Sequence, residues 1–148
     1  MELAETLNRR ARMFAVLQAL GFFAWQAGDG LARSDTSPAG FVGPAFMASG
    51  IGLGVWVVSL IVFFGVSWHA KKAGVFDIMN DEWSRHVRMK AAEAAFWATA
   101  IGVVVSMTAT NFGVDGWLLL KVLTGLAVAS FLLAYAWYDS RHEDGAHE

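Results

Sequence analysis

One acidic residue in this 148-residue chain stands out as a group that could do chemistry in apolar surroundings. Asp29 closes a stretch with no other charge after Arg12, and Gln18 and Gln26 precede it by eleven and three residues. On a helix these spacings place the three side chains on one face, and such a polar face is expected to contact other helices rather than lipid. Lys121 lies one turn into a later apolar run, at the same membrane face as Asp29. It is the expected ionic partner of Asp29, with Asp115 as a competitor.

Two roles fit this pair of charges. The first is a structural ion pair between two helices, and the second is part of a path for protons or ions. A path needs further polar groups along the span, and the remaining ones are equally well explained as interhelical hydrogen bonds. They are Gln18 together with Ser59, Thr99, Ser106, Thr108, Thr124 and Ser130. We therefore expect a structural pair and keep a transport path as the alternative.

Metal, haem and catalytic signatures are not found in the sequence. A haem within a membrane needs axial histidines inside the helices, whereas all four histidines lie outside the apolar runs, at positions 69, 86, 142 and 147. There is no cysteine, no phosphate-binding loop, no nucleophile elbow and no zinc-protease motif. We expect no catalytic residue, no metal and no cofactor. A cytoplasmic metal site formed by His69 and His86 with Asp77, Asp81 and Glu82 is the alternative.

The elements that must position these residues are four apolar segments. They cover about residues 13–31, 43–68, 91–111 and 117–138, and each is long enough, or nearly so, to cross a hydrocarbon core about 30 Å thick as a helix. A soluble bundle is disfavoured, because 56% hydrophobic residues leave little polar surface. We expect an all-α membrane protein of one domain, residues 1–148, built as two antiparallel hairpins.

The first segment also has the form of a secretory signal peptide, since arginines precede an apolar run and cleavage after Ala32 is conceivable. Its glutamines and aromatic residues favour an uncleaved helix. Both prolines, Pro38 and Pro44, fall in or next to the loop that follows. A second short turn at 111–116, with Gly113 and Gly116, separates the third and fourth segments.

The distribution of Lys and Arg predicts the orientation. Three lie before the first segment, five lie at 69–90 and one lies in the C-terminal tail, against Arg33 and Lys121 on the other side. Nine against two places both termini and the 69–90 connection in the cytoplasm of a bacterial cell, with the chain crossing the inner membrane four times.

A charged stretch at 77–97 runs into the third segment without a helix breaker. Asn80 is a good cap, so the third helix is expected to begin near Asp81. If it continues to Thr110 it is about 45 Å long, and roughly ten residues extend from the hydrocarbon into the cytoplasm. We expect this extension to bind a protein partner through Asp81, Glu82, Trp83, Arg85, His86 and Arg88.

Small residues spaced four apart occur in the second segment: Ala48 with Gly52, and Gly50 with Gly54. Such pairs let helix backbones approach closely in lipid. We expect packing within the chain, with formation of a homo-oligomer as the alternative.

The motif Asn-Asp-Glu-Trp-Ser-Arg-His-Val-Arg-Met-Lys-Ala at residues 80–91 resembles one found before the third helix in a loose group of small prokaryotic four-helix membrane proteins. Trp83 stands where that group usually has a basic residue. The resemblance implies a membrane inhibitor paired with a small DNA-binding regulator. We expect a non-enzymatic regulatory protein that binds a soluble partner and makes no direct contact with nucleic acid, given its net charge of −2. The alternatives are an accessory subunit of a membrane complex and, third, a small transporter.

Overall fold

The computed structural model describes the backbone of residues 2–34, 40, 42–74 and 82–145, and the side chains of these except 2–5, 82, 83 and 141–145. It contains four helices: α1 (Glu2–Arg33), α2 (Val42–Lys72), α3 (Glu82–Thr110) and α4 (Gly116–Gly145). An all-helical fold is thus confirmed for the described residues. The helices start and end beyond the apolar segments themselves, because the charged flanks continue the same helical turns.

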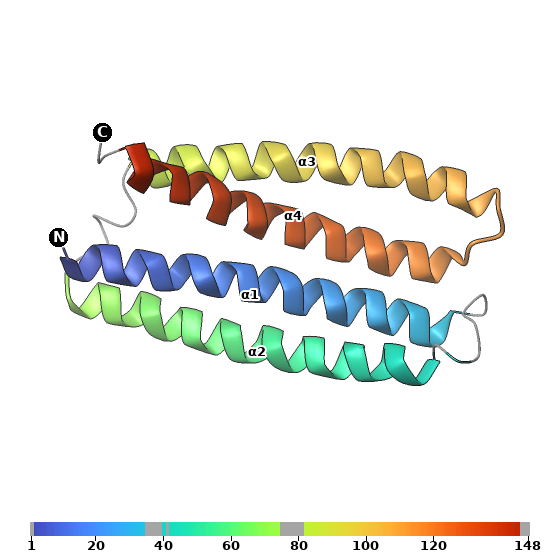
Figure 1. Ribbon diagram of the computed structural model, residues 1–148. Helices are drawn as coiled ribbons and strands as arrows, with labels where there is room; N and C mark the ends of the chain where they lie inside the picture. Colours follow the sequence, from blue (N-terminus) through green and yellow to red (C-terminus); the bar gives the residue numbers. More distant parts are fainter. Residues whose placement is uncertain (1, 35–39, 41, 75–81, 146–148) are drawn as a thin grey trace.

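The helices lie side by side in the order α2, α1, α4, α3 (Figure 1), with close contact between α1 and α2, α1 and α4, and α3 and α4. The arrangement is therefore an open layer, rather than a closed bundle, in which α2 and α3 occupy the edges. The central helices α1 and α4 have neighbours on both sides.

Three helices are long and apolar enough to cross a membrane: α2 along its whole length, α3 over Ser84–Thr110 and α4 over Gly116–Ser140. The described part of α1 does not reach the same apolar content. Its polar groups, among them Arg12, Gln18, Gln26 and Asp29, face neighbouring helices rather than the outside. A fourth crossing by α1 therefore remains a proposal.

The surface of the layer is apolar. Large hydrophobic side chains on α2 and α3 are exposed, as illustrated by Phe46 at 71% and Ile101 at 62%. The interior contains small residues instead, including Ala15, Ala19 and Ala91. This distribution is typical of a helix layer whose solvent is lipid, because lipid does not drive large apolar side chains inward.

The turn between α3 and α4 is closed by local chemistry. Gly113 has a φ of 80°, and the amides of Gly113 and Val114 donate to the carbonyls of Thr110 and Ala109, which is the Schellman arrangement. Asp115 then caps α4, since its Oδ1 accepts a hydrogen bond from the Trp117 amide at 2.7 Å.

Candidate functional site

The acidic residue singled out above pairs with a cation of α4. Lys121 Nζ lies 3.0 Å from Asp29 Oδ2, and Arg33 Nε lies 2.7 Å from Asp29 Oδ1 one turn along α1. The Asp29 side chain is only 14% exposed. The expected contact between Asp29 and Lys121 is therefore present. Asp115 instead caps α4.

Close helix contact brings these charges together. A Cβ added at Gly30 would lie 3.0 Å from the Lys121 Cβ and 3.1 Å from a Leu118 methyl. The missing side chain thus lets the first turn of α4 approach the end of α1. Lys121 also lies over the Trp117 ring, 4.9 Å from its centroid.

The polar stripe of α1 does not continue as a path through the layer. Gln18 is buried and its Nε2 donates to the Ser59 carbonyl of α2 at 3.4 Å. Gln26 is also buried, next to Gly125 of α4. The two amides therefore face different neighbours, although they belong to one stripe.

The interhelical hydrogen bonds expected from the Ser and Thr hydroxyls are mostly replaced by bonds within a helix. Thr99, Thr108 and Thr124 donate to the carbonyls four residues earlier, and Ser59 and Ser130 to the carbonyls three residues earlier. A hydroxyl in an apolar setting satisfies its donor most simply on its own helix. These five hydroxyls therefore donate within their own helices rather than between helices.

A second ionic cluster lies at the opposite end of α1 and α4. Asp139 is 4% exposed, and its Oδ2 lies 3.4 Å from Arg12 Nε and accepts a hydrogen bond of 3.0 Å from Asn8 Nδ2. Tyr135 lies one turn earlier on α4, within electrostatic range of Asp139, Arg12 and Arg88. Asp139 directly follows the apolar segment 117–138 in the sequence, and this cluster is not among the predicted contacts.

A signal for Asp139 does exist in the sequence. Lys121 and Asp139 are 18 residues apart, which is five full helical turns, so they share one face of α4. Arg12 and Asp29 are 17 residues apart on α1 in the same order, cation first, so antiparallel packing of α1 and α4 brings opposite charges together at both ends. The two ion pairs are thus about 26 Å apart along the helices, close to the hydrocarbon thickness of about 30 Å.

The residues expected to bind a partner are only partly described. Arg85, His86 and Arg88 are exposed on the first turns of α3. Asp81 lies outside the described residues, as do the side chains of Glu82 and Trp83. Next to them Val87 is 1% exposed, so this apolar residue holds α3 to its neighbour rather than serving a partner.

The helix around these residues is continuous from Glu82 to Thr110, 29 residues or about 43 Å. The extension is not special to α3, because the other helices have 30 to 32 residues and also continue beyond their apolar segments. The charged end is therefore shared by all the helices of the layer.

The predicted packing of the small residues of α2 is wrong for most of them. Within the chain only Gly52 packs as expected: a Cβ there would lie 2.5 Å from the Trp25 amide nitrogen and 2.7 Å from the Gly21 carbonyl oxygen. Gly50 and Gly54 have no atom within 4 Å of such a Cβ, and Ala48 is exposed. The face of α2 that contacts α1 is instead formed by Ala45, Ser49, Gly52 and Ser59.

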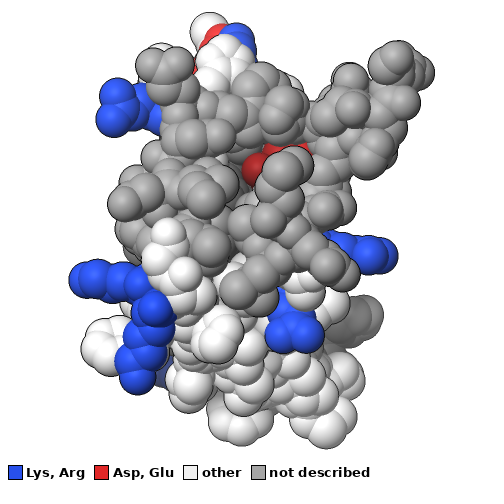
Figure 2. All heavy atoms as spheres, turned by 90° about the vertical axis from the view of Figure 1, so that its left-hand side faces the viewer, with Lys and Arg blue, Asp and Glu red and all other residues white. Residues whose placement is uncertain are grey.

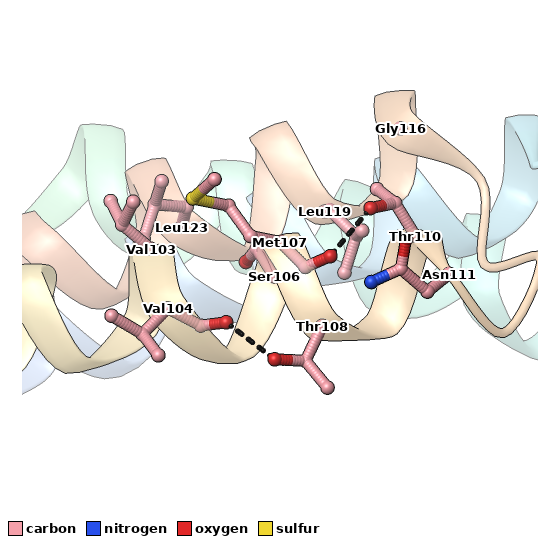
Figure 3. A pocket seen from close by; sticks show the side chains of 10 residues that line it. All are labelled: Val103, Val104, Ser106, Met107, Thr108, Thr110, Asn111, Gly116, Leu119 and Leu123. Carbon is pink, nitrogen blue, oxygen red and sulfur yellow. Dashed lines mark hydrogen bonds between the residues drawn. The ribbon is translucent and has the colours of Figure 1, made fainter.

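An open crevice of about 680 Å³ lies between α3 and α4 near their connecting turn (Figure 3). Val103, Met107 and Leu123 form apolar walls. The Thr108 and Thr110 hydroxyls at its edge donate to the carbonyls of Val104 and Met107, as the dashed lines show. No charged side chain and no histidine lines it, so its Ser and Thr hydroxyls have no general base among the lining residues. In the part of the chain that the structure describes, no three His, Asp or Glu side chains gather as metal ligands.

Comparison with known proteins finds no protein-family model, no curated protein and no solved structure that matches this chain. Function must therefore be argued from the chain's own residues.

Proposed function

We propose that the chain is a non-enzymatic regulatory protein of the bacterial inner membrane, which holds a soluble protein partner on the charged end of its helices. It crosses the bilayer as two antiparallel hairpins, α1 with α2 and α3 with α4, and both termini face the cytoplasm. The count of nine Lys and Arg against two supports this orientation.

The observation that carries the proposal is the exposed basic surface on α3. Arg85, His86 and Arg88 project from the first turns of a helix that continues unbroken into the apolar layer. A partner bound there contacts a rigid element, so its binding is coupled to how α3 packs on α4. A shift of α3 in the membrane would then change the affinity for the partner. The proposed partner is a DNA-binding regulator.

Affinity purification of the full chain in mild detergent tests this function. The double variant Trp83→Ala/Arg85→Ala is expected to lose a soluble DNA-binding partner that the parent recovers. The matched control Lys71→Ala/Lys72→Ala changes two residues at the same end of the molecule, on α2 instead of α3, and should keep it. Equal recovery by both variants would contradict the proposed surface.

An accessory subunit of a membrane complex is the second candidate, and one observation favours it. The exposed pair Gly50 and Gly54 leaves a shallow, unoccupied strip on the most apolar helix, where a helix of another membrane protein or of a second copy would fit. Recovery of integral membrane partners in the same purification, lost on Gly50→Leu, would favour this candidate.

Transport is the third candidate and rests on Asp29, Gln26 and Lys121. Its weakness is that Lys121 and Arg33 already pair with Asp29. Flux into reconstituted vesicles that disappears on Asp29→Asn would support it.

A further inference from the structure

A second crevice lies at the charged end of the layer, where α4 is flanked by α1 and α3. It is open, measures about 520 Å³, and is lined by Val16 of α1, Ala94 of α3 and a face of α4 that includes Leu133, Trp137 and Ser140. Its walls are apolar, with the Ser140 hydroxyl toward the charged end. Its shape and lining suit a hydrocarbon chain.

Cations lie beyond the mouth of this crevice. Lys90 is one turn before Ala94 on the same face of α3, and Arg9 is two turns before Val16 on α1, beyond Arg12. Arg9 and Lys90 are both exposed. Lys90 Nζ is 3.1 Å from Glu93 Oε2, which leaves two of its three N–H donors for another oxygen.

Most of the cations of the chain lie at this end. Of its eleven Lys and Arg residues, eight with described side chains lie here. Figure 2 views this end and shows Lys and Arg side chains spread around its rim. These eight are Arg9, Arg10, Arg12, Lys71, Lys72, Arg85, Arg88 and Lys90.

Exposed tryptophans mark the level at which the apolar surface ends. Trp68, Trp97 and Trp137 lie at this end of α2, α3 and α4 and are each more than half exposed. Tryptophan favours the boundary between hydrocarbon and headgroups. The crevice therefore opens at the depth where an acyl chain joins its headgroup.

We propose that an anionic phospholipid binds at this site, with one acyl chain in the crevice between α1 and α3 and its phosphate between Arg9 and Lys90. Anionic headgroups are attracted to clustered Lys and Arg next to a membrane. The lipid thereby bridges the two hairpins on one face of α4. This inference goes beyond the proposed function and uses different residues from the partner surface.

Native mass spectrometry of the full chain in detergent tests the site. Phosphatidylglycerol and phosphatidylcholine with identical acyl chains are added in equal amounts. The protein is expected to retain the anionic lipid in about fivefold excess, the factor that one well-placed Lys or Arg contributes. Equal retention of both lipids would overturn the proposal. Excess inorganic phosphate should not displace the lipid, and displacement would show a site for free anions instead.

Matched variants separate this site from general surface charge. Arg9→Gln/Lys90→Gln should bring the two lipids to near-equal retention, whereas Lys71→Gln/Lys72→Gln removes the same charge from α2, which α1 separates from the crevice, and should keep the preference. Equal loss in both variants would overturn the site. Ala94→Leu, which fills the crevice, should lower retention of both lipids, and unchanged retention would also overturn it. These variants retain Trp83 and Arg85, so recovery of the protein partner is expected to persist and is scored separately.

Discussion

Helices α1 and α2 pack against each other, but the more polar helix, α1, lies inside the layer and the more apolar helix, α2, lies at its edge. The described part of α1 carries Arg12, Gln18, Gln26 and Asp29 and lies between α2 and α4. The described length of α2 has no charge before its last turns and lies at the edge of the layer. In a soluble protein the more apolar helix would be the central one.

The difference shows which forces sort helices in lipid. Apolar side chains gain little by leaving hydrocarbon, so the interior is occupied by residues that allow close backbone approach or satisfy polar groups. Gly21, Gly28 and Ala19 of α1 provide close approach, and its charges find partners on α4. Three predictions test this contrast between an inner and an outer helix face.

The largest effect is expected where α2 contacts α1. Gly52→Leu places a side chain against the backbone of Trp25 and Gly21, and overpacking of this kind costs about 3 kcal/mol of unfolding free energy or more. Gly50→Leu, two residues away, adds the same side chain to an open face and should leave that free energy within about 0.5 kcal/mol. Denaturation in mixed micelles measures both. Equal losses would show that α2 has no distinct inner face.

A smaller effect is expected at the buried pair of Arg12 and Asp139. Asp139→Asn removes the negative charge that lies beside the nearly buried guanidinium of Arg12, which costs about 3 kcal/mol at most, since Asn8 and the amide can still hydrogen-bond. Arg12→Leu/Asp139→Leu removes both charges and should recover much of the loss. Denaturation in mixed micelles measures the unfolding free energy of each variant. If the double variant were no more stable than Asp139→Asn, the ion pair would not be the cause of the loss.

The smallest effect is expected at Asp29 and Lys121. The Lys121 side chain is 21% exposed and Arg33 supplies a second cation, so Asp29→Asn should cost about 1 kcal/mol. Exchange of the charges, Asp29→Lys with Lys121→Asp, should restore part of it. High salt should weaken this contact more than the one at Asp139. If the free energy of unfolding of the parent protein and of the variants did not change with salt, this ranking would be contradicted.

Much of the fold follows from the sequence by simple rules. The apolar runs predict four helices. Gly113 and Gly116 predict the short turn between the third and the fourth. The contact of Asp29 with Lys121 follows from opposite charges at matching ends of two apolar runs.

Two features do not follow from such rules, for physical reasons. Every face of α2 is apolar, so the helical period does not show which small residues face α1. Gly50 with Gly54 and Ser49 with Gly52 fit equally well. Asp139 directly follows an apolar run and precedes charged residues, so local composition assigns it to solvent. Only the approach of Arg12 from α1 reveals its burial.

The central claim is that α1 crosses the membrane as an inner helix of the layer. Cysteine accessibility tests it most directly. The chain has no cysteine, so single variants Arg10→Cys, Arg33→Cys, Lys72→Cys and Asn111→Cys each report one position. A maleimide that cannot cross the inner membrane should label Arg33→Cys and Asn111→Cys from outside, and the other two only after the membrane is opened. Labelling of Arg10→Cys and Arg33→Cys from the same side would contradict the account.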